Sequence, residues 1–195
     1  MDVLKNNIYL VKEHLGILKA ANNFDIHDPV SGAIIMECRE PTLGFFTKLL
    51  RFTDYKSMTP FDVQIRLPNG EPVVRIRRGI SIWLSRVEVT DSDNRLIGTF
   101  KQKLFSFGGK FDLLDSNDNV TCQLKGNLIG WNFRFIRDEI QLAHVSKQWS
   151  GLGKEFFTSA DNYVLEVNQQ VGEDMELRKL ILAAVMCIDM VLKEK

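Results

Sequence analysis

The C-terminal segment constrains the fold more than any other part of this sequence, because its helix signal has no polar face. From Glu173 onward the chain begins with acidic residues and ends with Lys193 and Lys195, which suits the dipole of a helix over about 174–193. Leu180 to Ile188 is an uninterrupted run of nine apolar residues. A helix that is apolar on all sides must be surrounded by protein or by lipid.

The length of this helix favours a protein environment. Residues 177–192 are 16 residues, or about 24 Å at about 1.5 Å per residue. The hydrocarbon core of a bilayer is thicker, at roughly 30 Å, and Asp189 lies near the end of the segment. We therefore expect a buried core helix, with a membrane span as the alternative. The residues expected to face the core are Leu180, Ile181, Leu182, Val185 and Ile188.

Regular turn signals divide the rest of the chain into short strands. Asn69-Gly70, Asp93-Asn94 and Asp118-Asn119 lie 24 and 25 residues apart, and such pairs tolerate the positive φ that two-residue hairpins require. A fourth turn is expected at Arg137-Asp138. Between turns, residues such as 61–67 alternate apolar and polar side chains, as a strand with one buried face does. The expected strands are 8–11, 23–27, 33–37, 61–67, 73–77, 81–90, 96–105, 110–114, 120–124, 131–136, 139–147 and 163–167.

These strands, over residues about 7–167, predict a mainly β fold. A sheet of this size in 195 residues tends to curl and close, which removes its exposed edges. A barrel of about twelve strands is too wide for its own side chains to fill, and the apolar helix needs an apolar sleeve. We therefore predict a closed antiparallel β-barrel of about twelve strands that encloses the C-terminal helix, as a single domain over residues 1–195.

Composition and charge exclude several classes of function. The formal net charge is zero, which argues against a nucleic-acid-binding protein. Cys38, Cys122 and Cys187 form no CxxC pair and the N-terminal sequence lacks the features of a signal peptide, so we expect a reducing, cytoplasmic location. A Gly-rich phosphate loop, a nucleophile elbow and an HExxH motif are all absent from the sequence. We therefore expect no enzyme activity and no cofactor.

Positive charge is concentrated in one part of this neutral chain, because residues 39–110 hold 13 basic and 7 acidic residues. Arg75 and Arg77 share one face of their strand. Lys101 and Lys103 do the same on theirs, and Arg86 lies on the strand expected to pair with it. We expect these side chains to bind the phosphate oxygens of anionic lipid. The alternative is an ordinary charged outer face of the barrel.

One further segment, residues 42–52 (TLGFFTKLLRF), is amphipathic, with six large apolar residues beside Lys48 and Arg51. Such an element either plugs the mouth of a barrel or lies in a membrane interface. We favour the plug.

The stretch 145–167, VSKQWSGLGKEFFTSADNYVLEV, resembles the C-terminal signature of phospholipid scramblases. Upstream, Thr59-Pro60-Phe61, Leu124-Lys125-Gly126 and Trp131-Asn132-Phe133 resemble the wider group of scramblase-related, LURP-one-like and tubby C-terminal proteins. This resemblance covers most of the chain. It implies a twelve-stranded barrel threaded by the C-terminal helix, and basic residues that bind phosphoinositide headgroups.

The same stretch contains the segment in which scramblases are proposed to bind calcium. Ser159 stands where that segment begins with Asp, whereas Asp161 and Asn162 are retained. Calcium prefers several oxygen ligands, which Asp161, Asn162 and Glu166 can supply. The alternative is a solvated turn in which Asp161 and Asn162 bond to the backbone.

Two functions compete at this point. The first is a non-enzymatic protein of the scramblase type, peripheral to a membrane, that binds phospholipid or phosphoinositide headgroups and aids transbilayer phospholipid movement. The second is a soluble tubby-like module that interacts with a protein partner in signalling.

Overall fold

The structure is a computed structural model that describes residues 2–14, 23–40, 60–79, 86–102, 110–127, 130–147 and 162–192. Within these ranges, twelve antiparallel strands form one closed barrel in which each strand pairs with its sequence neighbours. The barrel closes where β12 returns to β1, with Ile8 opposite Glu166. The strands are β1 (Ile8–Glu13), β2 (Phe24–His27), β3 (Ile34–Arg39), β4 (Phe61–Arg66), β5 (Pro72–Arg78), β6 (Arg86–Asp91), β7 (Leu96–Gln102), β8 (Phe111–Asp115), β9 (Val120–Asn127), β10 (Asn132–Arg137), β11 (Ile140–Ser146) and β12 (Asn162–Val167).

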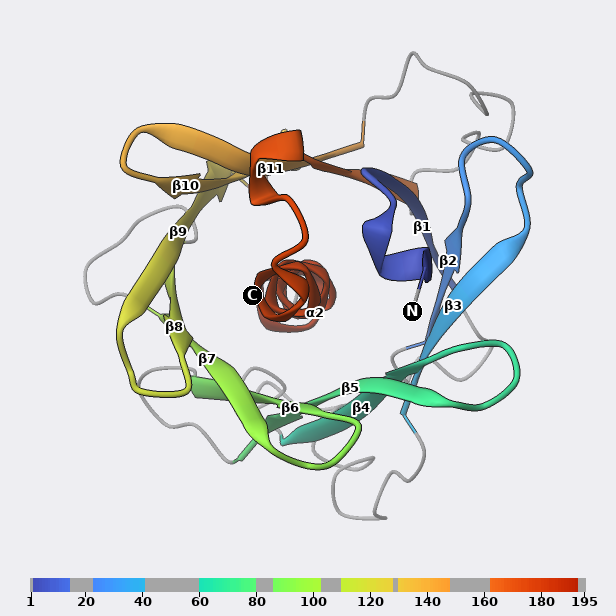
Figure 1. The fold of residues 1–195 in the computed structure, drawn as a ribbon, viewed down its shortest axis with the longest axis horizontal. Helices are drawn as coiled ribbons and strands as arrows, with labels where there is room; N and C mark the ends of the chain where they lie inside the picture. Colours follow the sequence, from blue (N-terminus) through green and yellow to red (C-terminus); the bar gives the residue numbers. More distant parts are fainter. Residues whose placement is uncertain are drawn as a thin grey trace.

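One long helix, α2 (Met175–Leu192), runs through the middle of the barrel (Figure 1). The prediction of a closed antiparallel barrel around the C-terminal helix is confirmed. Among the helices that the structure describes, none is both long enough and apolar enough to cross a membrane. The inward residues predicted on this helix are all buried, namely Leu180, Ile181, Leu182, Val185 and Ile188.

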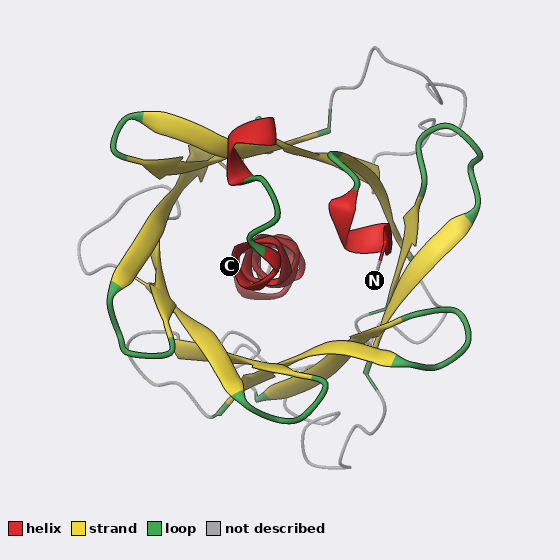
Figure 2. Cartoon of the chain, in the orientation of Figure 1, coloured by secondary structure: helices red, strands yellow, loops and turns green. Residues whose placement is uncertain are grey.

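The barrel wall is two-faced because side chains alternate along each strand. In β4, Phe61, Val63 and Ile65 are buried, whereas the residues between them are partly exposed. Figure 2 shows this wall as a ring of strands around the helix. Wall and helix touch closely at Gly98 of β7, where a Cβ would lie 2.7 Å from the Leu180 side chain and would also clash with the Leu114 carbonyl oxygen.

The hairpin turns differ from the predicted two-residue type. Three of them are three-residue loops, in which the last loop residue has a positive φ: 91° at Gly70, 61° at Asn94 and 62° at Asp118. A type I turn followed by a left-handed residue fits this loop length. The two-residue turn is between β10 and β11, at Asp138 and Glu139, one residue later than predicted.

Aspartates fix several of these turns by accepting bonds from the turn backbone. The Asp91 carboxylate accepts from the amides of Asp93 and Arg95, both at 2.9 Å, and from the Arg95 guanidinium. Asp115 accepts in the same way from the amides of Asn117 and Asn119. The sequence Asp-x-Asp/Asn before a strand therefore encodes the turn.

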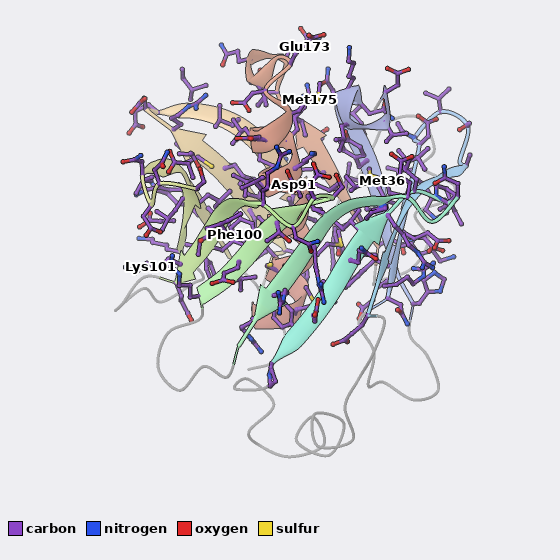
Figure 3. The ribbon with its side chains drawn as sticks, turned by 60° about the horizontal axis from the view of Figure 1, so that its bottom comes forward. Met36, Asp91, Phe100, Lys101, Glu173 and Met175 are labelled. Carbon is purple, nitrogen blue, oxygen red and sulfur yellow. The ribbon has the colours of Figure 1, made fainter. Side chains whose placement is uncertain are left out.

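The alternation of strand direction gives the barrel two unlike ends. At one, which we call the turn end, lie the short hairpin turns that follow β2, β4, β6, β8 and β10. The short helices η1 (Asp2–Lys5) and η4 (Gln169–Val171) precede β1 and α2 there, and Figure 3 labels Glu173 and Met175 where α2 begins. At the other, the far end, β1, β3, β5, β7, β9 and β11 finish.

Candidate lipid-binding surface

The structure brings two of the predicted basic residues together on the outer face of β5. Asp62 of β4 binds both of them. The Arg75 guanidinium donates to its two carboxylate oxygens at 2.8 and 2.6 Å, and Arg77 Nε lies 3.7 Å from Asp62 Oδ2. Hydrogen bonding to Asp62, followed by its charge, raises the pKa of Arg75. These two arginines are therefore positioned on the outer wall by a carboxylate.

A second pair lies on the next two strands. Arg86 of β6 is directly opposite Lys101 of β7, and both are exposed. Arg86 also donates to Asp118 at 2.9 Å, and Asp112 of β8 lies opposite Lys101. Figure 3 labels Lys101 beside its buried neighbour Phe100 on the same strand. Lys103, the fifth predicted residue, lies outside the described residues, as does the amphipathic segment 42–52.

Acidic residues separate the two basic pairs. Glu88 of β6 lies opposite Arg77 and two residues from Arg86. We call the outer face of β5, β6 and β7 that carries Arg75, Arg77, Arg86 and Lys101 the basic surface. Sequence reasoning missed its acidic neighbours Asp62, Glu88 and Asp112. The signal for Asp62 was present, because the Asn69-Gly70 turn fixes the hairpin register in which Asp62 lies opposite Arg77.

The proposed calcium ligands are not gathered at one point. Asp161 lies outside the described residues, and Asn162 is the buried first residue of β12. Glu166 lies four residues further along that strand, which separates the two by about 13 Å at about 3.3 Å per residue, and its carboxylate lies 3.3 Å from His144 Nδ1. Among the residues described, no group of three or more His, Cys, Asp or Glu side chains is arranged to bind a metal. Calcium binding stays a prediction.

A buried arginine that sequence reasoning did not single out joins the two ends of the chain. Arg178 of α2 is 6% exposed. Its guanidinium donates to the carbonyl oxygens of Gly172, Leu4 and Asn6 at 2.7 to 3.1 Å, and to Asn7 Oδ1 at 3.0 Å. Four oxygens thus replace the water that this cation loses on burial. These contacts fix η1 against the start of α2.

At the far end, a second network surrounds a buried carboxylate. Asp25 of β2 bonds to Arg39 of β3, and its other oxygen lies 2.5 Å from His14 Nε2. Burial opposes the ionisation of Asp25, but the hydrogen bonds from Arg39 and His14 outweigh it and lower the pKa of this carboxyl. The network ties β1, β2 and β3 together where β1 and β3 end. His14 is thus a second partner of this carboxylate.

The described core residues pack closely in the barrel interior. All three cysteines are buried, and burial raises the pKa of Cys38 and Cys122 to about 12. These thiols stay protonated and unreactive at neutral pH. Between α2 and the wall lies an apolar cavity of about 10 Å³, lined by Phe100, Phe111, Leu113, Leu124, Ala184, Cys187 and Ile188. It is about the size of one water molecule.

A closed twelve-stranded barrel with a helix along its axis and charged side chains outside is the architecture of the tubby-like proteins. An X-ray structure of a protein from Arabidopsis thaliana shares it, with a TM-score of 0.53 and 15% identity over 95% of this chain and 90% of that one. At this identity the likeness concerns the fold alone.

The family follows from the sequence. A family model described as Scramblase matches residues 6–195, and the chain therefore belongs to the Scramblase family. Human phospholipid scramblase family member 5 is 24% identical over an alignment of 137 positions, and the match covers 62% of this chain and 49% of that protein. The chain thus spans about half the length of this human relative.

Proposed function

We propose that this protein binds the anionic headgroups of membrane phospholipids, phosphoinositides among them, through the basic surface on β5, β6 and β7. The observation that carries the proposal is the pair formed by Arg86 and Lys101, two exposed cations directly opposite each other on neighbouring strands. Membership of the Scramblase family supports a role at phospholipid membranes.

The chemistry of the basic surface fits phosphate. A guanidinium can donate two parallel hydrogen bonds to phosphate oxygens, as Arg75 already does to Asp62. A headgroup must compete with Asp62 for Arg75 and Arg77, so these two arginines exchange a carboxylate for a phosphate. Arg86 must likewise exchange Asp118, to which it donates at 2.9 Å, for a phosphate. Because Arg86 and Lys101 are exposed and directly opposite each other, we expect both to contact the same headgroup.

The test is cosedimentation with vesicles of phosphatidylcholine, with and without phosphatidylserine or a phosphoinositide. A basic residue near an anionic surface contributes about 1 kcal/mol. The double variant Arg86→Gln/Lys101→Gln should therefore bind roughly thirtyfold more weakly to anionic vesicles. The matched control is Arg134→Gln/Arg137→Gln, which removes the same charge from exposed positions on β10 and should bind nearly as wild type does.

The outcomes separate the competing functions. Equal losses in the two double variants would mean that net charge, rather than this surface, drives binding. If the wild-type protein ignores anionic vesicles at low salt, the proposal fails and the soluble interaction module takes its place. Transbilayer movement is a separate part of the proposal, and it is tested by the loss of fluorescence of labelled lipid in proteoliposomes on addition of a membrane-impermeant reductant.

A further inference from the structure

Another pair of cations faces outward on β9 and β10. Lys125 of β9 lies directly opposite Arg134 of β10, and both side chains are exposed. In the part of the chain that the structure describes, neither side chain forms an ion pair or a hydrogen bond. Arg86 of the basic surface differs in this respect, because it already donates to Asp118. We call Lys125 and Arg134 the β9–β10 pair.

The acidic side chains on the flanking strands bond to other residues. On β8, Asp112 accepts a hydrogen bond from Gln123 at 3.1 Å. On β12, the Glu166 carboxylate lies 3.3 Å from His144, and His144 stands between Glu166 and Arg134 in the register of the sheet. Like charges directly opposite each other destabilise a sheet. The fold therefore keeps two repelling cations side by side, with no carboxylate of the described residues bonded to either.

We infer that the β9–β10 pair binds a phosphate monoester, the dianion carried by a phosphorylated serine or threonine of a protein partner. Residues directly opposite on antiparallel strands have Cβ atoms about 4.5–5.5 Å apart, so one phosphate group can contact both side chains. The Arg134 guanidinium can donate two hydrogen bonds to its oxygens, and the Lys125 ammonium supplies a second positive charge. A phosphate monoester carries nearly two negative charges at neutral pH and matches the pair, whereas a carboxylate carries one.

The open strand surface favours a phosphorylated segment over a free phosphate ion. A free ion gains only the two contacts with Lys125 and Arg134. A segment that lies along the wall can also bond to neutral polar side chains on the same outer face, because Gln123 and Asn132 each stand two residues from one member of the pair.

The position of the pair on the barrel favours a protein partner over a lipid. Strands β9 and β10 lie three strands beyond β6 and β7 in a ring of twelve, which is a quarter of the circumference. Figure 1 shows β9 and β10 on a different side of the ring from β5 and β6. A flat bilayer against the basic surface therefore does not reach the pair. This choice of partner rests on the proposed function, and it agrees with the expectation that Arg134→Gln leaves vesicle binding nearly unchanged.

The test is an NMR titration of isotope-labelled protein with a short glycine peptide that contains one phosphoserine. Amide shifts should change in β9 and β10 around the pair, and should not change with the unphosphorylated peptide. The variant Lys125→Gln/Arg134→Gln should bind the phosphopeptide at least about tenfold more weakly, because it loses charge-assisted hydrogen bonds. The matched control Lys12→Gln/Arg137→Gln removes the same charge from exposed positions on β1 and at the end of β10, and should bind nearly as wild type does.

Other results of the titration would overturn the inference. Equal losses in the two double variants would show a response to net charge alone. Shifts centred on β5, β6 and β7 would place phosphate binding on the basic surface instead. If millimolar phosphopeptide causes no shift beyond that of the unphosphorylated peptide, the pair is not a phosphate site. A dispersed amide spectrum verifies that each variant is folded.

Vesicle cosedimentation separates this inference from the proposed function. Lys125→Gln/Arg134→Gln should pellet with phosphatidylserine vesicles nearly as wild type does, whereas Arg86→Gln/Lys101→Gln should lose vesicle binding and keep phosphopeptide binding. If the two variants lose vesicle binding equally, the β9–β10 pair contacts the bilayer and the assignment to a protein partner is wrong. If the wild-type protein binds the phosphopeptide but no vesicle, the proposed function fails and the phosphate site stands.

Discussion

The inside and the outside of the barrel use arginine in different ways. Inside, Arg178 is bound by four neutral oxygens at fixed backbone and side-chain positions, and Arg78 lies 4.7 Å from the centroid of the Phe61 ring. Outside, Arg75 is bound by one carboxylate in contact with water. An inner arginine therefore has a single arrangement that the fold depends on. An outer arginine can exchange its partner, which is what binding a phosphate requires.

The largest effect is expected when a charge is introduced inside the barrel. Leu182→Asp places a carboxylate at a position that is 1% exposed, in the middle of α2. A buried unpaired charge costs several kcal/mol, enough to remove most of the stability of a typical domain. Loss of the cooperative unfolding transition in urea would confirm this loss of stability. The control Leu182→Met conserves volume and polarity and should stay folded; a native transition in Leu182→Asp would contradict a packed central helix.

The next effect compares the two kinds of arginine directly. Arg178→Gln leaves the buried carbonyl oxygens of Leu4, Asn6 and Gly172 without the guanidinium that donates to them. The variant should lower the free energy of unfolding by about 3 kcal/mol. Arg75→Gln breaks a half-exposed ion pair and should cost less than about 1 kcal/mol. Urea midpoints of the two variants measure the difference. Similar midpoints would show that the inner arginine is no more structural than the outer one.

Close contact between the wall and α2 gives a third, smaller effect. In Gly98→Ala the new methyl group meets the Leu180 side chain and the Leu114 carbonyl oxygen. Overpacking of this kind costs about 1–3 kcal/mol. Thermal unfolding should detect it as a lower Tm. Gly130→Ala is the matched control, since nothing lies within 4 Å of a Cβ there, and its Tm should be close to that of wild type.

The smallest effect concerns the buried carboxylate of Asp91 at the turn end and depends on pH. Burial opposes ionisation of Asp91, but the amide and side chain of Arg95 and the amide of Asp93 lower its pKa. The folded protein thus binds fewer protons at Asp91 than the unfolded chain does, and this carboxylate stabilises the fold at neutral pH. Its contribution should fade as the pH falls below about 4. The stability difference between wild type and Asp91→Asn, measured at pH 7 and pH 3, should therefore shrink in acid; a constant difference would contradict it.

The features that sequence alone predicted are those encoded by local periodicity. Alternation in residues such as 61–67 and the unbroken apolar run from Leu180 to Ile188 need no knowledge of partners, so the strands, the closed barrel and the central helix followed from them. The type of each turn could not be predicted in this way, because a residue pair such as Asp118-Asn119 does not by itself show which of its members takes the positive φ. The structure assigns it to Asp118.

Hydrogen-bond partners that are distant in the sequence are the hardest part of the site to predict. The oxygens that bind Arg178 include those of Leu4 and Asn6, more than 170 residues away, and nothing in the sequence around Arg178 indicates them. The pairing of Asp62 with Arg77 is easier to predict, because both lie in one hairpin whose register places them opposite each other. Candidate cations can thus be found from alternation. Whether each is bound by an acid depends on register and side-chain reach, which only coordinates supply.

The pairing of β1 with β12 has a consequence for how the chain folds. Ile8 must meet Glu166, and α2, which follows all twelve strands in the chain, must lie inside the ring before that ring can close. Contacts between residues so far apart in sequence slow folding, because a long loop loses entropy before the contact forms. During synthesis on the ribosome, an incomplete ring exposes apolar inner strands and two unpaired edges to neighbouring chains. Until the helix is made, the apolar inner faces of the strands lack the element that covers them in the folded protein.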